Sequence, residues 1–165
     1  MAIRPADHGI FASSAGGITG AAYFAGGNTS GATVDKFAFS DDSRTTLGTG
    51  LSAANSLLAG AANSGTAAYF AGGETAAAKV TTVDKFAFSN DSRTTLGTGL
   101  ATATRGLAGA AKSGTAAYFA GGYTGSTVST VDKFAFADDS RTTLGTGLSV
   151  ARYGLAGAAN SGVLE

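Results

Sequence analysis

Cysteine and tryptophan are absent from this chain of 165 residues, and histidine, proline and methionine occur once each. Without cysteine the chain has no disulfide, no thiolate nucleophile and no cysteine-ligated metal site, and its redox compartment stays undetermined. The single histidine, His8, lies near the N-terminus, and no Ser-His-Asp set can be assembled around it. Thiol chemistry is therefore excluded, and a histidine-centred active site has no support.

Charge is also scarce, since Asp, Glu, Lys and Arg make up 13% of the residues, about half the usual share. Eleven basic residues balance eleven acidic ones, so no surplus of positive charge favours nucleic acid or an anionic membrane. No apolar run approaches the roughly 20 residues of a membrane helix, and no signal-peptide core follows Arg4. We expect a soluble protein that binds neither nucleic acid nor membrane, and its localisation is unknown.

Glycine is abundant, with 26 residues, and it recurs at regular places because the sequence repeats itself three times. YFAGG begins at Tyr23, Tyr69 and Tyr118, and VDKFAF begins at positions 34, 83 and 131. RTTLGTGL and LAGAA also recur in steps of 49 and then 48 residues. A period of this length indicates a solenoid, a propeller or an array.

Each repeat divides into four short segments, LAGAA, TAAYFA, VDKFAF and RTTLGTGL, which are separated by turn residues. A helix is disfavoured because each glycine in its interior would cost about 1 kcal/mol. In VDKFAF, Val83 and Phe86 lie on opposite faces, as in a sheet covered on both sides. The pattern predicts three antiparallel sheets of four strands, each strand five to seven residues long, with essentially no helix.

The repeated aromatic residues are candidates for a core between neighbouring sheets. They are Tyr23, Tyr69, Tyr118, Phe37, Phe86 and Phe134, with the phenylalanines two places later, Phe39, Phe88 and Phe136. The LAGAA segments are expected to lie innermost, where converging strands leave room only for small side chains.

The succession of YFAGG, a variable linker, VDKFAF, a polar turn and LSVARYGLAGAANSG resembles the kelch repeat, over residues 9–162. Arg44, Arg93 and Arg141 stand where kelch repeats usually carry Trp, so the blades are expected to pack differently, with small residues allowing a closer approach. The resemblance implies an all-β fold, a β-propeller of four-stranded antiparallel blades, with three kelch-like blades in this chain.

We assign residues 1–165 to a single repeat domain. The head segment, 1–17, has a candidate extra strand. The three repeats follow at 18–65, 66–114 and 115–162. The Val-Leu-Glu end, 163–165, breaks the repeat and could be a cloning remnant.

Three blades are too few to close a propeller, since propellers typically have four to eight. Identical chains give multiples of three, so we expect a homodimer that closes one six-bladed ring about a two-fold axis. Residues 154–162 are a complete LAGAA-type strand with no blade after it, and the head at 9–17 aligns with the same strand. Either segment could complete a partner's first blade, and the better register of the tail favours the tail.

The repeated polar residues suggest structural roles. The Gly-Gly pairs lack the following helix that a phosphate loop needs. The turns at 40–46 and 89–95 resemble the Asp box of sialidase-like propellers, and Asp42, Asp91 and Asp139 are expected to cap their own hairpins. These turns could offer oxygens to Ca²⁺, but Asn90 interrupts the pattern and calcium takes six or more oxygens. The Asp-Lys pairs that start at positions 35, 84 and 132 are expected to pair across a strand or a blade.

An enzyme usually needs single-copy acids, bases or metal ligands, whereas most charged residues here come in threes. We therefore expect no catalytic residue, no metal and no cofactor.

The copies differ mainly in the linkers after Gly-Gly and in those before LAGAA, so these linkers are expected to be loops, with neutral surface drift as the alternative. The candidate binding-loop residues are Asn28, Thr29, Asn55, Glu74, Lys79, Arg105, Tyr123, Arg152 and Tyr153.

The leading interpretation is a non-enzymatic propeller scaffold or binding module that displays variable loops to a protein or a glycan. One alternative is a fragment or engineered segment of a larger propeller that self-assembles. Another is a sialidase-like, carbohydrate-active propeller, in which Arg44, Arg93 and Arg141 would have to gather at the channel mouth. A galactose-oxidase-like enzyme is disfavoured because its copper site needs several histidines and a Cys-linked Tyr.

Overall fold

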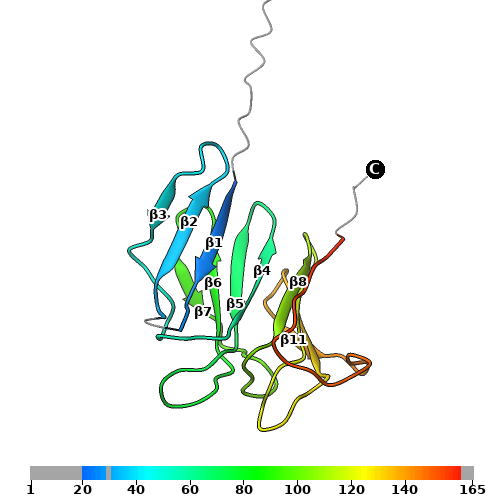
Figure 1. The fold of residues 1–165 in the computed structure, drawn as a ribbon. Helices are drawn as coiled ribbons and strands as arrows, with labels where there is room; N and C mark the ends of the chain where they lie inside the picture. The colour runs from blue at the N-terminus through cyan, green and yellow to red at the C-terminus, as the bar shows by residue number, and fades with distance from the viewer. Residues whose placement is uncertain (1–19, 29–30, 161–165) are drawn as a thin grey trace, which may run out of the picture.

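The computed structural model describes residues 20–28 and 31–160, and within these residues the fold is all-β, with no helix. Three antiparallel sheets stand side by side, with β1 to β3 at one end of the row and β8 to β11 at the other (Figure 1). No helix of membrane-spanning length and apolarity occurs in this part of the chain. The head at 1–17, with His8, and the residues from 161 onward lie outside the described residues.

The first sheet has three strands in chain order: β1 (Ala21–Ala25), β2 (Val34–Ala38) and β3 (Arg44–Thr46). The second sheet has four: β4 (Ala59–Asn63), β5 (Ala67–Ala71), β6 (Val83–Ala87) and β7 (Arg93–Thr95). The third has β8 (Ala108–Lys112), β9 (Ala116–Ala120), β10 (Val131–Ala135) and β11 (Arg141–Thr143). Every pairing joins neighbours in the chain, so each sheet is a meander.

The prediction of repeated antiparallel sheets is confirmed, with two corrections. The first sheet has three strands rather than four, because among the described residues no LAGAA-type strand lies at the free edge of β1. The outermost strands, β3, β7 and β11, have three residues each rather than five to seven, since the RTT portion alone pairs with the preceding strand before the chain turns away.

The core lies between successive sheets, in two layers. In the second sheet Val83 and Phe86 are both fully buried on opposite faces, as expected for a sheet covered on both sides. One layer joins the first and second sheets through Val34, Leu51, Ala68, Phe70 and Phe86. The other joins the second and third sheets and includes Tyr69, Val83, Leu100, Phe119 and Phe134. Thus the first and second sheets present Val and Tyr to the next sheet, and the second and third sheets present two Phe rings to the sheet before.

The aromatic core prediction holds for Tyr69, Phe86 and Phe134, each at most 1% exposed. It is wrong for Phe39, which is 54% exposed. The equivalent rings pack against a tyrosine of the preceding sheet, for example Phe88 against Tyr23 at 5.0 Å between ring centres. No described sheet precedes the first one, so Phe39 has no such neighbour.

The LAGAA strands of adjacent sheets lie against each other, as β4 and β8 do. Gly109 of β8 sits so close to β4 that a Cβ in its place would lie 2.1 Å from the carbonyl oxygen of Gly60. The small residues of LAGAA are therefore required where the sheets converge.

Candidate functional site

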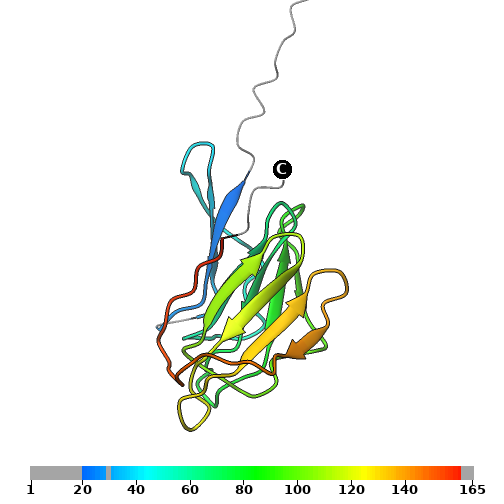
Figure 2. The same cartoon turned by 90° about the vertical axis from the view of Figure 1, so that its right-hand side faces the viewer.

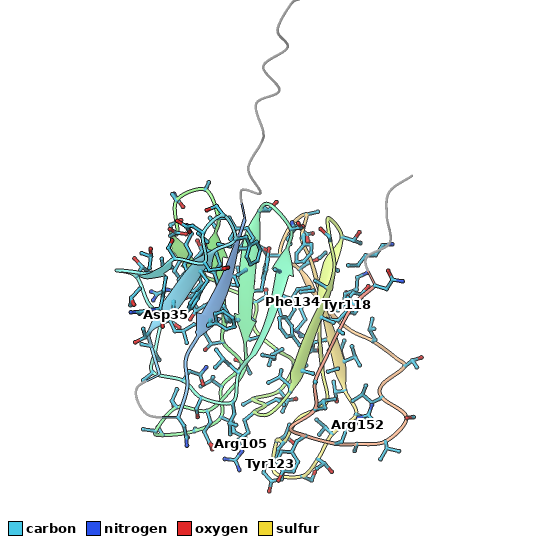
Figure 3. The ribbon with its side chains drawn as sticks, turned by 45° about the horizontal axis from the view of Figure 1, so that its top comes forward. Asp35, Arg105, Tyr118, Tyr123, Phe134 and Arg152 are labelled. Atoms are coloured by element: carbon cyan, nitrogen blue, oxygen red, sulfur yellow. The ribbon has the colours of Figure 1, made fainter. Side chains whose placement is uncertain are left out.

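The loops in which the three copies differ meet at one end of the sheets. In the second and third sheets the loop after the Gly-Gly pair bridges to the linker that precedes the LAGAA strand of the same sheet, and these bridges join Ser56 to Glu74 and Arg105 to Tyr123. The backbone N–H of Tyr123 donates to the carbonyl of Arg105 at 2.8 Å. Arg105, Tyr123 and Arg152 lie together at the lower end of the molecule in Figure 3.

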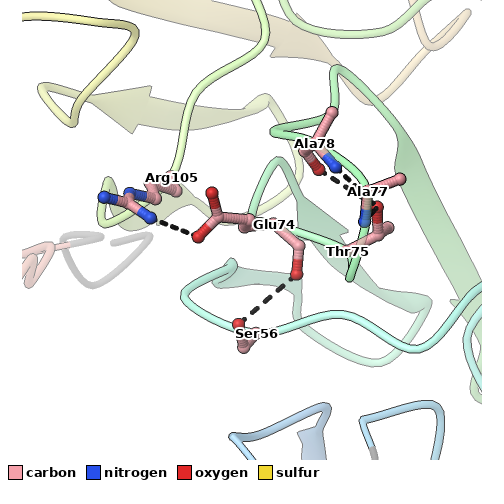
Figure 4. A network of polar contacts seen from close by, with 6 residues as sticks. All are labelled: Ser56, Glu74, Thr75, Ala77, Ala78 and Arg105. Carbon is pink, nitrogen blue, oxygen red and sulfur yellow. Dashed lines mark hydrogen bonds and ion pairs between the residues drawn. The ribbon is translucent and has the colours of Figure 1, made fainter.

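Five side chains from these loops form what we call the rim cluster: Glu74, Lys79, Arg105, Tyr123 and Tyr153. Arg105 forms an ion pair with Glu74 (Figure 4). Its guanidinium also lies 5.3 Å from the ring centre of Tyr123, and Lys79 Nζ lies 5.8 Å from the same centre. The ring of Tyr153 lies 5.9 Å from that of Tyr123, tilted by 58°. Two cations and a second aromatic ring therefore surround Tyr123.

The rim cluster has the chemistry of a binding surface. Tyr153 is 62% exposed, so its ring is available to stack on an apolar face. Arg105 and Lys79 add hydrogen-bond donors, and Glu74 adds an acceptor. The sequence prediction named all five residues, because packing does not dictate positions that differ between near-identical copies.

The other candidate residues do not join this cluster. Asn55 is structural, since its side-chain amide donates to the carbonyl of Gly72 at 2.6 Å and so holds the end of β5. Arg152 is exposed and adjoins Tyr153, and Asn28 is exposed in the loop after β1. Thr29 lies outside the described residues.

The Gly-Gly pairs form no phosphate cradle, because their N–H groups are already bonded. Gly72 donates to the carbonyl of Thr82 at 2.9 Å, and Gly73 donates to Thr104 at 2.8 Å. The other two pairs bond in the same way. A phosphate would find no free amides at these turns.

The acidic turns differ from the prediction. The cap of each hairpin comes from the residue before the expected one, as when Asp41 accepts from the N–H of Ser43 at 3.1 Å. Asp91 and Asp139 have positive φ of 56° and 57°, which directs their carboxylates to the preceding sheet. Asp139 there accepts from Tyr69 Oη at 2.7 Å and from Lys85 Nζ at 2.8 Å.

Burial and the bond to Asp139 raise the pKa of Tyr69 to about 12. Burial disfavours the charged form of Lys85, yet the hydrogen bond to Asp139 raises the pKa of this lysine. The same contact recurs one sheet earlier, where Tyr23 and Lys36 both donate to Asp91. Lys36 and Lys85 thus bind across sheets, as expected, and the raised pKa of each keeps it protonated in the folded chain.

The repeated arginines are held one to a sheet. Arg44 NH1 lies 3.2 Å from Asp35, Arg141 NH1 lies 3.5 Å from Asp132, and Arg93 donates to the carbonyl of Gly50 at 2.8 Å. Each therefore serves its own sheet or the junction with the neighbouring one. Within residues 20–28 and 31–160, no three His, Asp or Glu side chains are grouped as metal ligands would be.

In the part of the chain that the structure describes, the outer edge of β1 is unpaired and borders a groove of about 1300 Å³, lined by Tyr23, Phe24, Gly60 and Phe70 among others. In the complete sheets, β4 and β8 occupy the corresponding position beside β5 and β9. Phe24 is 61% exposed in this groove, whereas its equivalents Phe70 and Phe119 are 8% and 2% exposed. The difference arises because a LAGAA strand covers the equivalent rings, and Gly60 touches Phe70 in this way.

The opposite end of the row carries a further LAGAA-type segment, which forms no strand of its own. The segment 155–160, which repeats the LAGAA sequence, runs beside β8 and belongs to no sheet (Figures 1 and 2). Gly157 lies against the carbonyl of Gly109, just as Gly109 lies against that of Gly60. The N–H of Gly154 donates to Gly106 at 2.7 Å, as Gly106 donates to Leu57 at 2.8 Å. The tail thus occupies the first-strand position of a fourth sheet.

No protein-family model and no curated protein sequence matches the chain. The architecture stands on the geometry of the described residues alone: three antiparallel sheets in a row, the first with three strands and the others with four, followed by a LAGAA segment that belongs to no sheet.

Proposed function

We propose that the chain is a non-enzymatic β-propeller scaffold of the kelch type, in which two copies close one six-bladed ring. One observation carries the proposal: among residues 20–28 and 31–160 the first sheet has no LAGAA-type inner strand, while the tail of the same chain holds a LAGAA segment that belongs to none of the three sheets. β1 and the segment 155–160 lie at opposite ends of the row, so this segment does not complete the first sheet of its own chain (Figure 1). The tail of a second copy can do so.

The end faces of the row support the same arrangement. The first sheet presents Phe24 and Phe37, and the third sheet presents Tyr118 and Val131, which are the two kinds of surface that meet inside the chain. Exposed apolar faces and an unpaired strand edge favour association. Joining opposite ends twice gives a closed ring with six sheets, inside the range of four to eight blades of known propellers.

The ring would display the rim cluster twice, once on each copy. The exposed tyrosine and the charged donors of the cluster suit a protein or a glycan ligand. Because the three repeats differ at these positions, each chain has the cluster at one place. A self-assembling segment of a larger or engineered propeller remains the alternative, and the near-identical copies favour it. The sialidase-like alternative has less support because each arginine is bonded within its sheet or to the adjoining linker.

Multi-angle light scattering at micromolar concentration tests the ring. We expect a species of twice the 16.0 kDa mass of one chain, with no larger species as the concentration rises, because a closed ring leaves no free end. A single-chain mass, or a mass that keeps growing with concentration, would contradict closure by two copies.

A further inference from the structure

A polar contact accompanies each junction between sheets inside the chain. The tyrosine of one sheet and the lysine of its next strand both donate to a carboxylate in the acidic turn of the following sheet. At the first junction Lys36 Nζ lies 2.9 Å from Asp91, and at the second Lys85 Nζ lies 2.8 Å from Asp139. We call this Tyr-Lys-Asp contact the junction latch.

Half of a latch stands at each end of the row. The third sheet carries Tyr118 and Lys133, which face each other across β9 and β10 in the same register as Tyr69 and Lys85. The first sheet carries Asp42, exposed, with a φ of 55° that matches those of the two bonded aspartates. Among the described residues, none of these three side chains makes a polar contact with a protein partner.

The geometry points to a third and fourth latch between copies: Tyr118 and Lys133 of one chain bind the Asp42 carboxylate of a second copy. The inference rests on the proposed ring and names the contact that sets its direction and register. A two-fold contact of like ends would instead bring two Asp42 turns, or two Lys133 side chains, together and would repel.

A latch is needed because the rest of the interface specifies register weakly. The exchanged tail is LAGAA, so within the tail the register beside β1 depends mainly on one glycine, at the place where the sheets converge. An ion pair reinforced by a tyrosine hydroxyl has one good position. The positive φ of Asp42 already turns the carboxylate outward, so little ordering is required on binding.

Asp42→Asn tests the latch, with Asp91→Asn as the matched control. Asn tolerates positive φ, so both variants keep the turn while removing the charge. We expect the dimer Kd of Asp42→Asn to rise at least tenfold, because each ring contains two altered junctions. Asp91→Asn alters a junction inside the chain, so it should lower the unfolding midpoint and leave the dimer Kd within about twofold.

Mixing two variants tests the direction of assembly. A mixed dimer of an Asp42→Asn chain and a ¹⁵N-labelled Lys133→Met chain has one junction altered on both sides and one native junction. Native mass spectrometry should therefore show more mixed dimer than the statistical half.

The outcomes separate the latch from the ring. A wild-type dimer whose Kd is unchanged by Asp42→Asn overturns the latch and leaves the ring intact. Equal weakening by Asp91→Asn, or a statistical mixture of the variants, also overturns it. A wild-type chain that stays single contradicts the ring itself, and the latch with it.

Discussion

At the scale of single residues, equivalent positions of the three repeats can be compared with one another. Leu57 has a φ of 55°, while the equivalent residues in the next two copies, Gly106 and Gly154, are glycines with φ of 63° and 65°. A side chain in this left-handed region costs about 1–2 kcal/mol. The Leu57 side chain is 53% exposed, so its burial offsets little of that cost.

Leu57→Gly should therefore raise the free energy of unfolding by about 1 kcal/mol, the relief of strain being reduced by the greater freedom of glycine in the unfolded chain. Urea denaturation followed by circular dichroism measures the change. The reverse substitution, Gly106→Leu, should lower stability. Leu57→Gly with an unchanged or lower midpoint would show that no strain is stored there.

The sequence predicted residue roles best where one residue acts alone. The glycines at strand ends and the loop character of Tyr123 and Arg105 follow from local patterns. The partner of Asp91 cannot be predicted from local patterns, because it lies on another sheet. Which residue of the turn caps the hairpin, and which binds the preceding sheet, depends on the backbone φ of Asp91. Asn55 resembled a variable loop residue, and its bond to Gly72 is visible only in three dimensions.

At the scale of strands, turn residues fix where each element ends, so the positions of the strands were predictable. The lengths of β3, β7 and β11 were not, because pairing with one neighbour, rather than residue type, decides how far an outer strand extends. The close approach of β4 and β8 was expected from the small residues of LAGAA, and it requires glycine at position 109.

Gly109→Ala should destabilise the chain by about 1–3 kcal/mol, because the new methyl group would collide with the backbone of β4. Gly97→Ala is the control, since nothing lies within 4 Å of a Cβ at that position. Thermal unfolding of both variants gives the comparison. Equal stability of the two would mean that the sheets do not converge on β8 as closely as described.

At the scale of the whole molecule, the open row and its two unlike ends make the tail the decisive element. Deleting residues 155–165 should abolish dimerisation while the three sheets stay folded, because the deletion removes the strand that would fill the groove beside β1. Deleting 1–17 is the matched control and should leave the dimer intact. Light scattering measures the mass, and circular dichroism checks that β structure persists. A dimer that survives loss of the tail but not of the head would assign the closing strand to residues 9–17, whose sequence aligns with LAGAA less well.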